Sequence, residues 1–160
     1  MKAQEFEMEN FSKFGKNFQE KLVHCMFYDR AFFDQMSDIF DIYFLELKYL
    51  RLFYSRLLDY RNTYEKHPSV DIMVSVIKTE LEDESEVVRK QVKDYFARIA
   101  VSEAVEDAEY VKATALDFCK KQKLKEAIMK SVGLLKTSSF DEIKEVIDGA
   151  MKLGLDNDHG

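Results

Sequence analysis

Few side chains in this chain of 160 residues combine the residue types and the spacing that metal binding or acid–base chemistry needs. The histidines are His24, His67 and His159. Glu20 lies one helical turn before His24, so these two side chains could share a metal ion. A di-metal carboxylate bundle, however, needs two Glu-x-x-His pairs and two further glutamates that project inward. Because Glu20 and His24 lie opposite the helical face of Phe18 and Leu22, we interpret them as an exposed pair and expect no metal site.

The glycines are too few and too widely spaced to form a phosphate-binding loop. A P-loop has the pattern G-x-x-x-x-G-K-[ST], but the single Gly-Lys pair, Gly15-Lys16, is followed by Asn17 and has Asn10 five residues before the glycine. Glycines at 15, 133, 149, 154 and 160 cannot form G-x-G-x-x-G either. The sequence therefore predicts neither ATP hydrolysis nor a cofactor in this chain, and we expect that it is not an enzyme.

A dense basic run is the remaining candidate for recognition chemistry. Such a run could contact an acidic partner or a nucleic-acid backbone, whereas the acids close to it in the sequence favour the plainer interpretation of a solvated helix face. The net charge of −6, from 24 basic and 30 acidic side chains, excludes a free-standing binder of duplex DNA, because such proteins normally have a strong basic excess. The run consists of Lys120, Lys121, Lys123 and Lys125.

The composition indicates which elements must position these groups. Hydrophobic residues make up 46% of the chain and charged residues 34%, which is enough apolar matter for a core. Five glycines and one proline cannot supply the frequent turns of a sandwich or a barrel, so we predict an all-α fold. Cys25 and Cys119 have no CxxC spacing and fit two reduced core thiols in a cytoplasmic protein. Because neither a secretory signal nor an apolar run of about 20 residues is visible, we expect no contact with a membrane.

Apolar residues at spacings of three and four divide the chain into a small multi-helix head and a protruding C-terminal helical hairpin. Residues 1–13 are acidic with scattered phenylalanines and are interpreted as a loose N-terminal arm. The head covers 14–104. Pro68 ends one of its helices, and Ser69 and Ser85 are the expected N-caps of the next two. The head helices are predicted over about 15–27, 30–37, 44–66, 70–81 and 86–99.

The hairpin is predicted over 105–153 and is followed by a short tail at 154–160. Its first helix is expected from about 107 to 136, since Gly133 is the one residue in this stretch that disfavours a helix. A tight turn follows at residues 137–138.

The second hairpin helix has recognisable signals at both ends. Ser139 and Glu142 have the spacing of a capping box, in which each side chain bonds to the backbone N–H of the other residue. The helix is expected to end near Leu153, with Gly154 as the residue that follows the cap.

The apolar stripe of the first hairpin helix does not stay on one face. In the first half Val111, Ala115 and Phe118 cluster together, whereas the aliphatic residues of the second half lie roughly 100° further round, and the change falls at 120–123. The two halves must therefore pack against different things. The apolar surface of the hairpin exceeds what one short partner helix can cover, which predicts association with another copy of the chain. The expected subunit interface is formed by Leu124, Ile128, Val132, Leu135, Phe140, Ile143, Ile147 and Met151.

Taken in order, these segments resemble the N-terminal domain of hexameric replicative DNA helicases of the DnaB type, in particular the divergent bacteriophage versions. Residues 15–26 (GKNFQEKLVHCM) and 29–35 (DRAFFDQ) look like the opening helix of that head and the step that follows it. Residues 64–73 (YEKHPSVDIM) are similar to the end of its long helix, the Pro-Ser pair and the next short helix. Residues 109–128 and 139–151 look like the two-helix arm of the family.

The resemblance implies a collar domain whose hairpins pair between subunits, as dimer pairs and possible hexamers in a parent helicase. It implies contact with a primase or a helicase loader and only weak or indirect contact with single-stranded DNA. For a phage-encoded protein it implies the cytoplasm of the bacterial host. The tail at 154–160 would begin a linker to an ATPase domain that this sequence does not contain. A free-standing helical adaptor, such as a helicase loader, stays open as an alternative, and the gene beyond Gly160 would distinguish the two.

Overall fold

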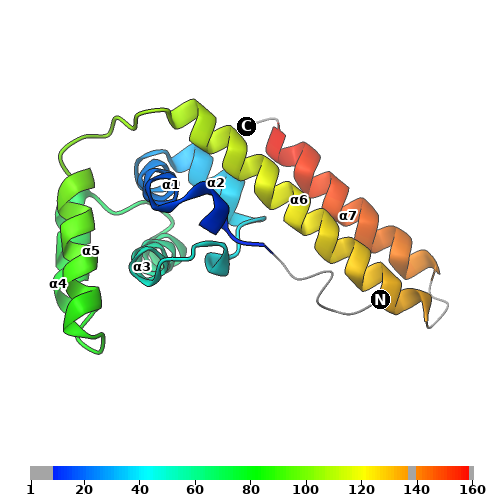
Figure 1. Ribbon diagram of the computed structural model, residues 1–160, viewed down its shortest axis with the longest axis horizontal. Coiled ribbons are helices and arrows are strands. Elements are labelled where there is room, and N and C mark those ends of the chain that lie inside the picture. Colours follow the sequence, from blue (N-terminus) through cyan, green and yellow to red (C-terminus); the bar gives the residue numbers. More distant parts are fainter. Residues whose placement is uncertain (1–8, 137–139, 159–160) are drawn as a thin grey trace. The chain divides into compact units, whose positions relative to one another are not determined.

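The computed structural model describes residues 9–136 and 140–158, with side chains described up to Leu153. In these residues all regular secondary structure is helical, with seven α-helices and no strand, which confirms the predicted all-α fold. Figure 1 shows the helices in chain order. They are η2 (Phe11–Phe14), α1 (Lys16–Tyr28), α2 (Arg30–Ser37), η3 (Ile42–Phe44), α3 (Lys48–Tyr64), α4 (Val70–Thr79), α5 (Glu86–Ile99), α6 (Ala108–Leu135) and α7 (Phe140–Asp158), where η marks a 3-10 helix.

The described chain divides into two compact units, which we call the head unit and the hairpin unit. The head unit consists of residues 10–30 and 41–111. The hairpin unit contains residue 9, residues 31–40 and the described residues from 112 onward. This division differs from the predicted boundaries of 14–104 and 105–153, because most of α2 belongs with the hairpin.

The head unit is built around an aromatic core. Helix α3 packs against α1 and α5, and one phenylalanine from each helix meets at the centre. Phe27, Phe53 and Phe96 are 0–4% exposed, and their ring centroids lie 5.4–5.9 Å apart. Rings at these distances and in tilted or edge-on orientations attract one another in addition to burying apolar area. These three phenylalanines therefore form the centre of the core of the head unit.

The expected loose arm is wrong for residues 10–13, which belong to the head unit and place Phe11 in its core. Phe11 is fully buried, and its ring lies 5.8 Å from that of Phe18 and 6.0 Å from that of Phe44. The side chain of Asn10 accepts a hydrogen bond from the backbone N–H of Ser12 and so caps the short helix η2. The rest of the expected arm, residues 1–8, lies outside the described residues.

Local signals in the sequence set most helix boundaries of the head unit. The hydroxyls of Ser69 and Ser85 accept hydrogen bonds from the backbone N–H groups of Ile72 and Val88, which confirms both predicted N-caps. Gly15 precedes α1 with a φ of 89°, a conformation that side chains with a Cβ rarely adopt.

Helix α3 begins later than predicted. Residues 42–44 form the separate 3-10 helix η3, whose start is capped by the side chain of Asp41, and Leu45 and Leu47 are extended. Tyr64, the last residue of this helix, is 60% exposed.

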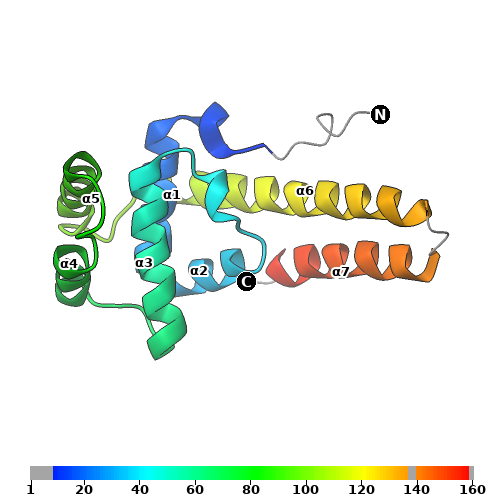
Figure 2. The same cartoon turned by 90° about the horizontal axis from the view of Figure 1, so that it is seen from below.

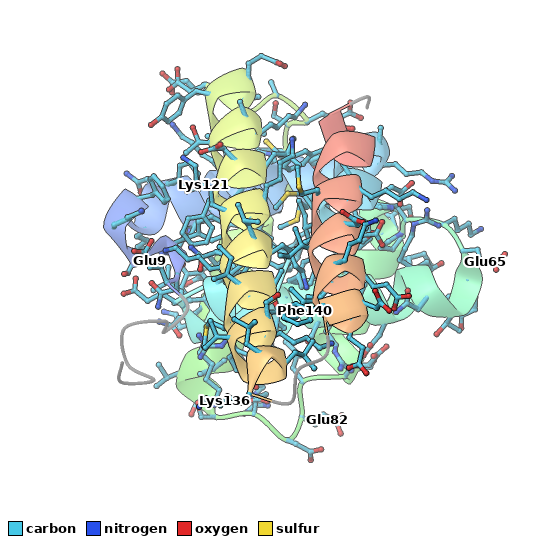
Figure 3. The ribbon with its side chains drawn as sticks, turned by 90° about the vertical axis from the view of Figure 1, so that its right-hand side faces the viewer. Glu9, Glu65, Glu82, Lys121, Lys136 and Phe140 are labelled. Carbon is cyan, nitrogen blue, oxygen red and sulfur yellow. The ribbon has the colours of Figure 1, made fainter. Side chains whose placement is uncertain are left out.

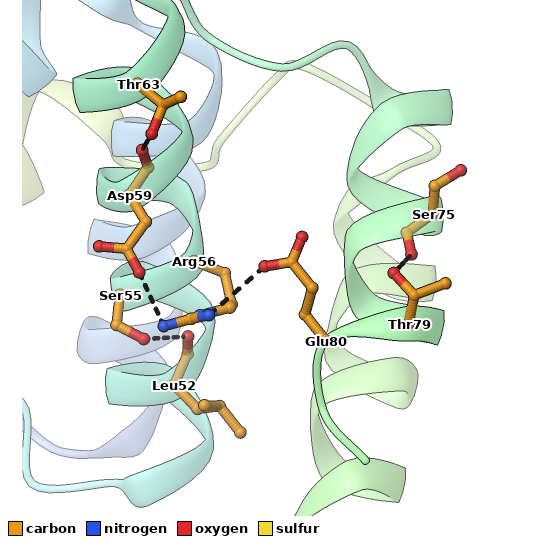
Figure 4. A network of polar contacts seen from close by, with 8 residues as sticks. All are labelled: Leu52, Ser55, Arg56, Asp59, Thr63, Ser75, Thr79 and Glu80. Atoms are coloured by element: carbon orange, nitrogen blue, oxygen red, sulfur yellow. Dashed lines mark hydrogen bonds and ion pairs between the residues drawn. The ribbon is translucent and has the colours of Figure 1, made fainter. Parts of the chain in front are cut away.

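An arginine ties α3 to the end of α4 (Figure 4). The guanidinium of Arg56 lies 2.7 Å from the carboxylate of Asp59 on the same helix and 3.4 Å from the carboxylate of Glu80, which follows α4. These carboxylates are about half exposed, so the two ion pairs contribute little to the free energy of unfolding.

In the hairpin unit, α6 and α7 lie side by side (Figures 1 and 2). The predicted turn at Thr137 and Ser138 and the expected cap Ser139 lie outside the described residues. The predicted end near Leu153 is wrong, since α7 continues through Gly154 to Asp158. No described helix combines the length and the apolarity that a bilayer crossing would need.

Candidate interaction surface of the helical hairpin

Helix α6 changes the kind of residue that it buries along its length. In the first half the buried positions are apolar, with Ala115, Phe118 and Cys119 at 0–5% exposure. In the second half they are Gln122, Ala127 and Ser131, at 2–7% exposure. Small and polar residues thus occupy the buried side of α6 in its second half, where the aliphatic residues lie on another side of the helix.

The aliphatic side chains of the second half of α6 are instead open to solvent. Leu124, Ile128, Val132 and Leu135 are 41–54% exposed. At about 100° per residue these positions fall within an arc of about 80° on one side of the helix.

Helix α7 has an apolar face that the described chain leaves uncovered. None of its side chains from Phe140 to Leu153 is buried. Phe140 and Met151 are 71% and 57% exposed, and Ile143 and Ile147 are half-buried. A helix normally gains its stability by burying such a face, so α7 is incompletely packed within its own chain.

The two stripes together form what we call the hairpin surface. It is the set expected from sequence, and Figure 3 looks onto the two helices that carry it, with Lys136 and Phe140 near their adjoining ends. Its members are Leu124, Ile128, Val132, Leu135, Phe140, Ile143, Ile147 and Met151.

A shallow groove of about 250 Å³ runs between the two helices of the hairpin. Ala127 of α6 and Val146, Gly149 and Ala150 of α7 are among its lining residues. A Cβ built on Gly149 would meet no atom within 4 Å, so no close contact within the chain requires a glycine there. The two helices therefore leave open space between them and are not tightly interlocked at this place.

The lysines of the basic run are engaged with acids of the same chain. Lys121 lies 2.9 Å from Asp117, Lys123 lies 3.6 Å from Glu126, and Lys125 lies 3.7 Å from Glu9. Lys120 is also engaged within the chain. This pairing offsets the positive charge that a phosphate backbone would need, and it favours the interpretation of a solvated helix face.

The expectation of an exposed Glu20 is wrong, because this carboxylate lies in the head unit at 9% exposure. Its two oxygens accept hydrogen bonds from the guanidinium of Arg98 at 2.8 and 3.0 Å, and one of them also accepts from the hydroxyl of Tyr49 at 2.5 Å. The hydroxyl of Tyr95 donates to the backbone carbonyl of Glu20 at 2.6 Å. We call these four residues the Glu20 cluster.

In the Glu20 cluster, the negative charge of Glu20 is balanced by Arg98 and by hydrogen bonds within the head unit. Burial raises the pKa of Glu20, but the hydrogen bonds from Arg98 and Tyr49 outweigh it, so the net pKa lies below the usual value. Burial and the nearby carboxylate raise the pKa of Tyr49 and of Tyr95, which keeps both hydroxyls protonated as donors. The ring nitrogen Nε2 of His24 lies 2.9 Å from the carbonyl oxygen of Ser102, so it donates there. Among the described residues, no group of histidine, cysteine and acidic side chains has the arrangement of a metal site.

Sequence reasoning missed the residues whose partners are distant in the chain. Gln122 lies at 120–123, where the apolar stripe shifts, but it is buried and its side-chain oxygen accepts a hydrogen bond from the backbone N–H of Glu9 at 3.3 Å. Ser131 is buried because its hydroxyl donates to the carbonyl of Ala127 one turn earlier. A serine in a helix can satisfy itself in this way, whereas nothing near Gln122 in the sequence indicates its partner.

No protein-family model, no curated protein and no solved structure matches this chain.

Proposed function

We propose that this chain is the assembly domain of a replicative DNA helicase of the DnaB type, and that its hairpin surface pairs with the hairpin surface of a second copy. The observation that carries the proposal is the exposed apolar face of α6 and α7. The helicase assignment is supported by the order of the segments that resemble that family. In this role the collar formed by paired hairpins would also present a primase or a helicase loader with its docking surface.

The size of the hairpin surface fits weak but specific pairing. Its six most exposed side chains are 41–71% exposed. For side chains of this size, that leaves on the order of 500 Å² of apolar area, toward the upper end of what a typical monomer exposes in one patch. A standard interface buries roughly 800 Å² per partner. The apolar stripes and the polar residues around them therefore supply about the area that a symmetric pair of hairpins needs.

Sedimentation of an Ile128→Asp variant tests the pairing. Ile128 lies in the middle of the α6 stripe and is 43% exposed, so a carboxylate there stays hydrated in the monomer but would be buried between two copies. We expect the parent chain to associate as its concentration rises, and the variant to associate at least tenfold more weakly. The helical circular dichroism of the two proteins should be the same.

A matched control separates this site from a general effect of added charge. Val87 on α5 is 69% exposed and lies outside the hairpin surface, so Val87→Asp should associate as the parent does. If Ile128→Asp sediments as the parent does at every concentration, or if Val87→Asp weakens association equally, the hairpin surface is not the interface.

The helicase assignment has a separate test. A gene that continues past Gly160 into a strand followed by G-x-x-x-x-G-K-[ST] would join this domain to an ATPase, as the proposal expects. A stop codon directly after that residue would instead favour the free-standing adaptor.

A further inference from the structure

A second apolar feature lies in the head unit, between α4 and α5. These helices run side by side (Figures 1 and 2), and a groove of about 310 Å³ lies between them. Its floor is formed by Ile77 and Phe96, both 4% exposed, and its walls include Ala97 and Ala100. We call it the α4–α5 groove. Its volume is at the lower end for ligand sites, enough for one large side chain and the chain that carries it.

Two lysines at the groove have no ion-pair partner among the described residues. Lys78 of α4 and Lys93 of α5 line the groove and are exposed. In the described part of the chain neither has an ion pair, although other exposed lysines of the head unit do, such as Lys48 with Glu84. In a chain with a net charge of −6, two unpaired cations beside an apolar floor are complementary to an acidic segment with an apolar anchor.

The chain itself contains a short stretch with that chemistry, around Phe6, in a segment that also contains Lys2. Its first eight residues, MKAQEFEM, place Phe6 between two glutamates, Glu5 and Glu7. The number of carboxylates that flank the ring equals the number of unpaired lysines at the groove. A phenylalanine is also the kind of large, rigid anchor that fills a pocket at an interface.

We propose that the α4–α5 groove binds the N-terminal segment, residues 1–8, of a second copy of the chain. Phe6 enters the groove over Ile77 and Phe96, and the two adjacent glutamates pair with the two lysines. The proposal depends on the proposed function only for the presence of a second copy. It would add a contact from head to N-terminal segment to the pairing of hairpins, so that each copy could engage two neighbours.

Binding of a synthetic peptide tests the groove independently of hairpin pairing. The peptide has the sequence of residues 1–8 with a fluorophore and an amidated C-terminus. The protein is the full chain with Phe6→Ala, which removes its own competing anchor, and Ile128→Asp, which removes hairpin pairing. We expect saturable binding with a Kd below about 1 mM by fluorescence anisotropy, in the range of a weak peptide contact.

Variants on both sides assign the binding to the groove. Adding Lys78→Glu and Lys93→Glu to the protein should weaken binding at least tenfold, and so should Phe6→Ala in the peptide. The control is Lys90→Glu, because Lys90 is exposed on the same helix but does not line the groove. It should leave the Kd unchanged, and the thermal unfolding midpoints of all these proteins should agree.

Two results would overturn the proposal. One is the absence of saturable peptide binding. The other is binding that Lys90→Glu weakens as much as the groove variants do, or that survives the loss of the phenylalanine. Either result leaves the hairpin proposal untouched, because that proposal is tested by sedimentation of the chain without any peptide.

Discussion

The core of the head unit and helix α7 of the hairpin contain similar kinds of apolar residue, but these residues are buried in the head and exposed or half-buried in α7. In the head, Phe27, Phe53 and Phe96 are at most 4% exposed, and their rings pack against one another in tilted or edge-on orientations. In α7, no described side chain is buried, and the ring of Phe140 is 71% exposed. The head therefore completes its packing within one chain. Helix α7 has an apolar face like that of a core helix, but no described element covers it. This difference between the two regions is the reason for proposing an interface.

The two regions also differ in the polar residues that they bury. The head buries a carboxylate, Glu20, and satisfies it with a guanidinium and a hydroxyl. The hairpin buries Gln122 and Ser131, whereas Leu124, Ile128 and Leu135 are 43–54% exposed. A buried polar group costs little when all its hydrogen bonds are made, whereas exposed aliphatic side chains gain stability only when something covers them. Both arrangements are consistent with a head that is fully packed by itself and with the proposed pairing of the hairpin.

Replacing a phenylalanine by alanine should have very different effects on the free energy of unfolding in the two regions. Phe53 is fully buried, so Phe53→Ala should lower the free energy of unfolding by about 3–5 kcal/mol. Phe140→Ala at low protein concentration should lower it by less than about 0.5 kcal/mol, because that ring already contacts solvent. Urea unfolding followed by circular dichroism measures both. Equal losses in the two variants would mean that α7 is as well packed as the head.

Removing the buried charge of the head should produce a smaller, pH-dependent loss. Glu20→Gln should destabilise the chain by roughly 1–3 kcal/mol at pH 7, because Arg98 and Tyr49 lose an ionised acceptor. The pKa of Glu20 is lowered in the folded chain, so its contribution is present above the pKa of the unfolded chain and is lost as the pH falls through the folded value. The difference between parent and variant should therefore shrink as the pH falls below 4.5, the ordinary value for this group.

A surface glutamate provides the control for that pH dependence. Glu82 is exposed and has no described partner, so Glu82→Gln should track the parent at every pH. A constant difference between Glu20→Gln and the parent from neutral pH to pH 3 would show that the loss comes from packing and not from the charge.

The smallest expected effect is that of a glycine-to-alanine change in the hairpin. A methyl group at Gly149 would meet no atom within 4 Å, so Gly149→Ala should stabilise α7 by about 0.5–1 kcal/mol at low concentration, where the chain is monomeric. Gly133→Ala on α6 is a second variant with the same open surroundings. If a second copy approaches α7 closely at Gly149, the same change should weaken association in sedimentation. A loss of stability at low concentration would contradict the open packing described for this helix.

The sequence predicted what depends on local spacing. Helical periodicity located α1, α2, α5 and α6 to within a few residues, and the hydroxyls of Ser69 and Ser85 are the caps that their positions suggested. The displaced stripe of α6 predicted that Ile128 and its neighbours would be exposed. These features are local because each is fixed by residues within one or two turns.

The sequence failed where a residue depends on a distant partner. Glu20 faces away from the apolar stripe of its own helix, but it is buried and its carboxylate pairs with Arg98, which lies 78 residues later. Phe11 belongs to a short acidic stretch, yet the rings of Phe18 and Phe44 enclose it. Gly154 has the usual chemistry of a helix end, but α7 continues past it. No periodicity within one helix contains this information, because the contacts arise only when separate elements pack.

Amide hydrogen exchange as a function of protein concentration tests the central claim most directly, because it reports on both regions in one sample. If the hairpin surface pairs with a second copy, protection of α7 and of the second half of α6 should rise by tenfold or more from about 10 µM to 1 mM protein, since association adds to the free energy of opening. Protection of α3 and α5 against local opening should stay constant over the same range. Concentration-independent exchange throughout α7, measured in a protein that sediments as an associated species, would contradict the account.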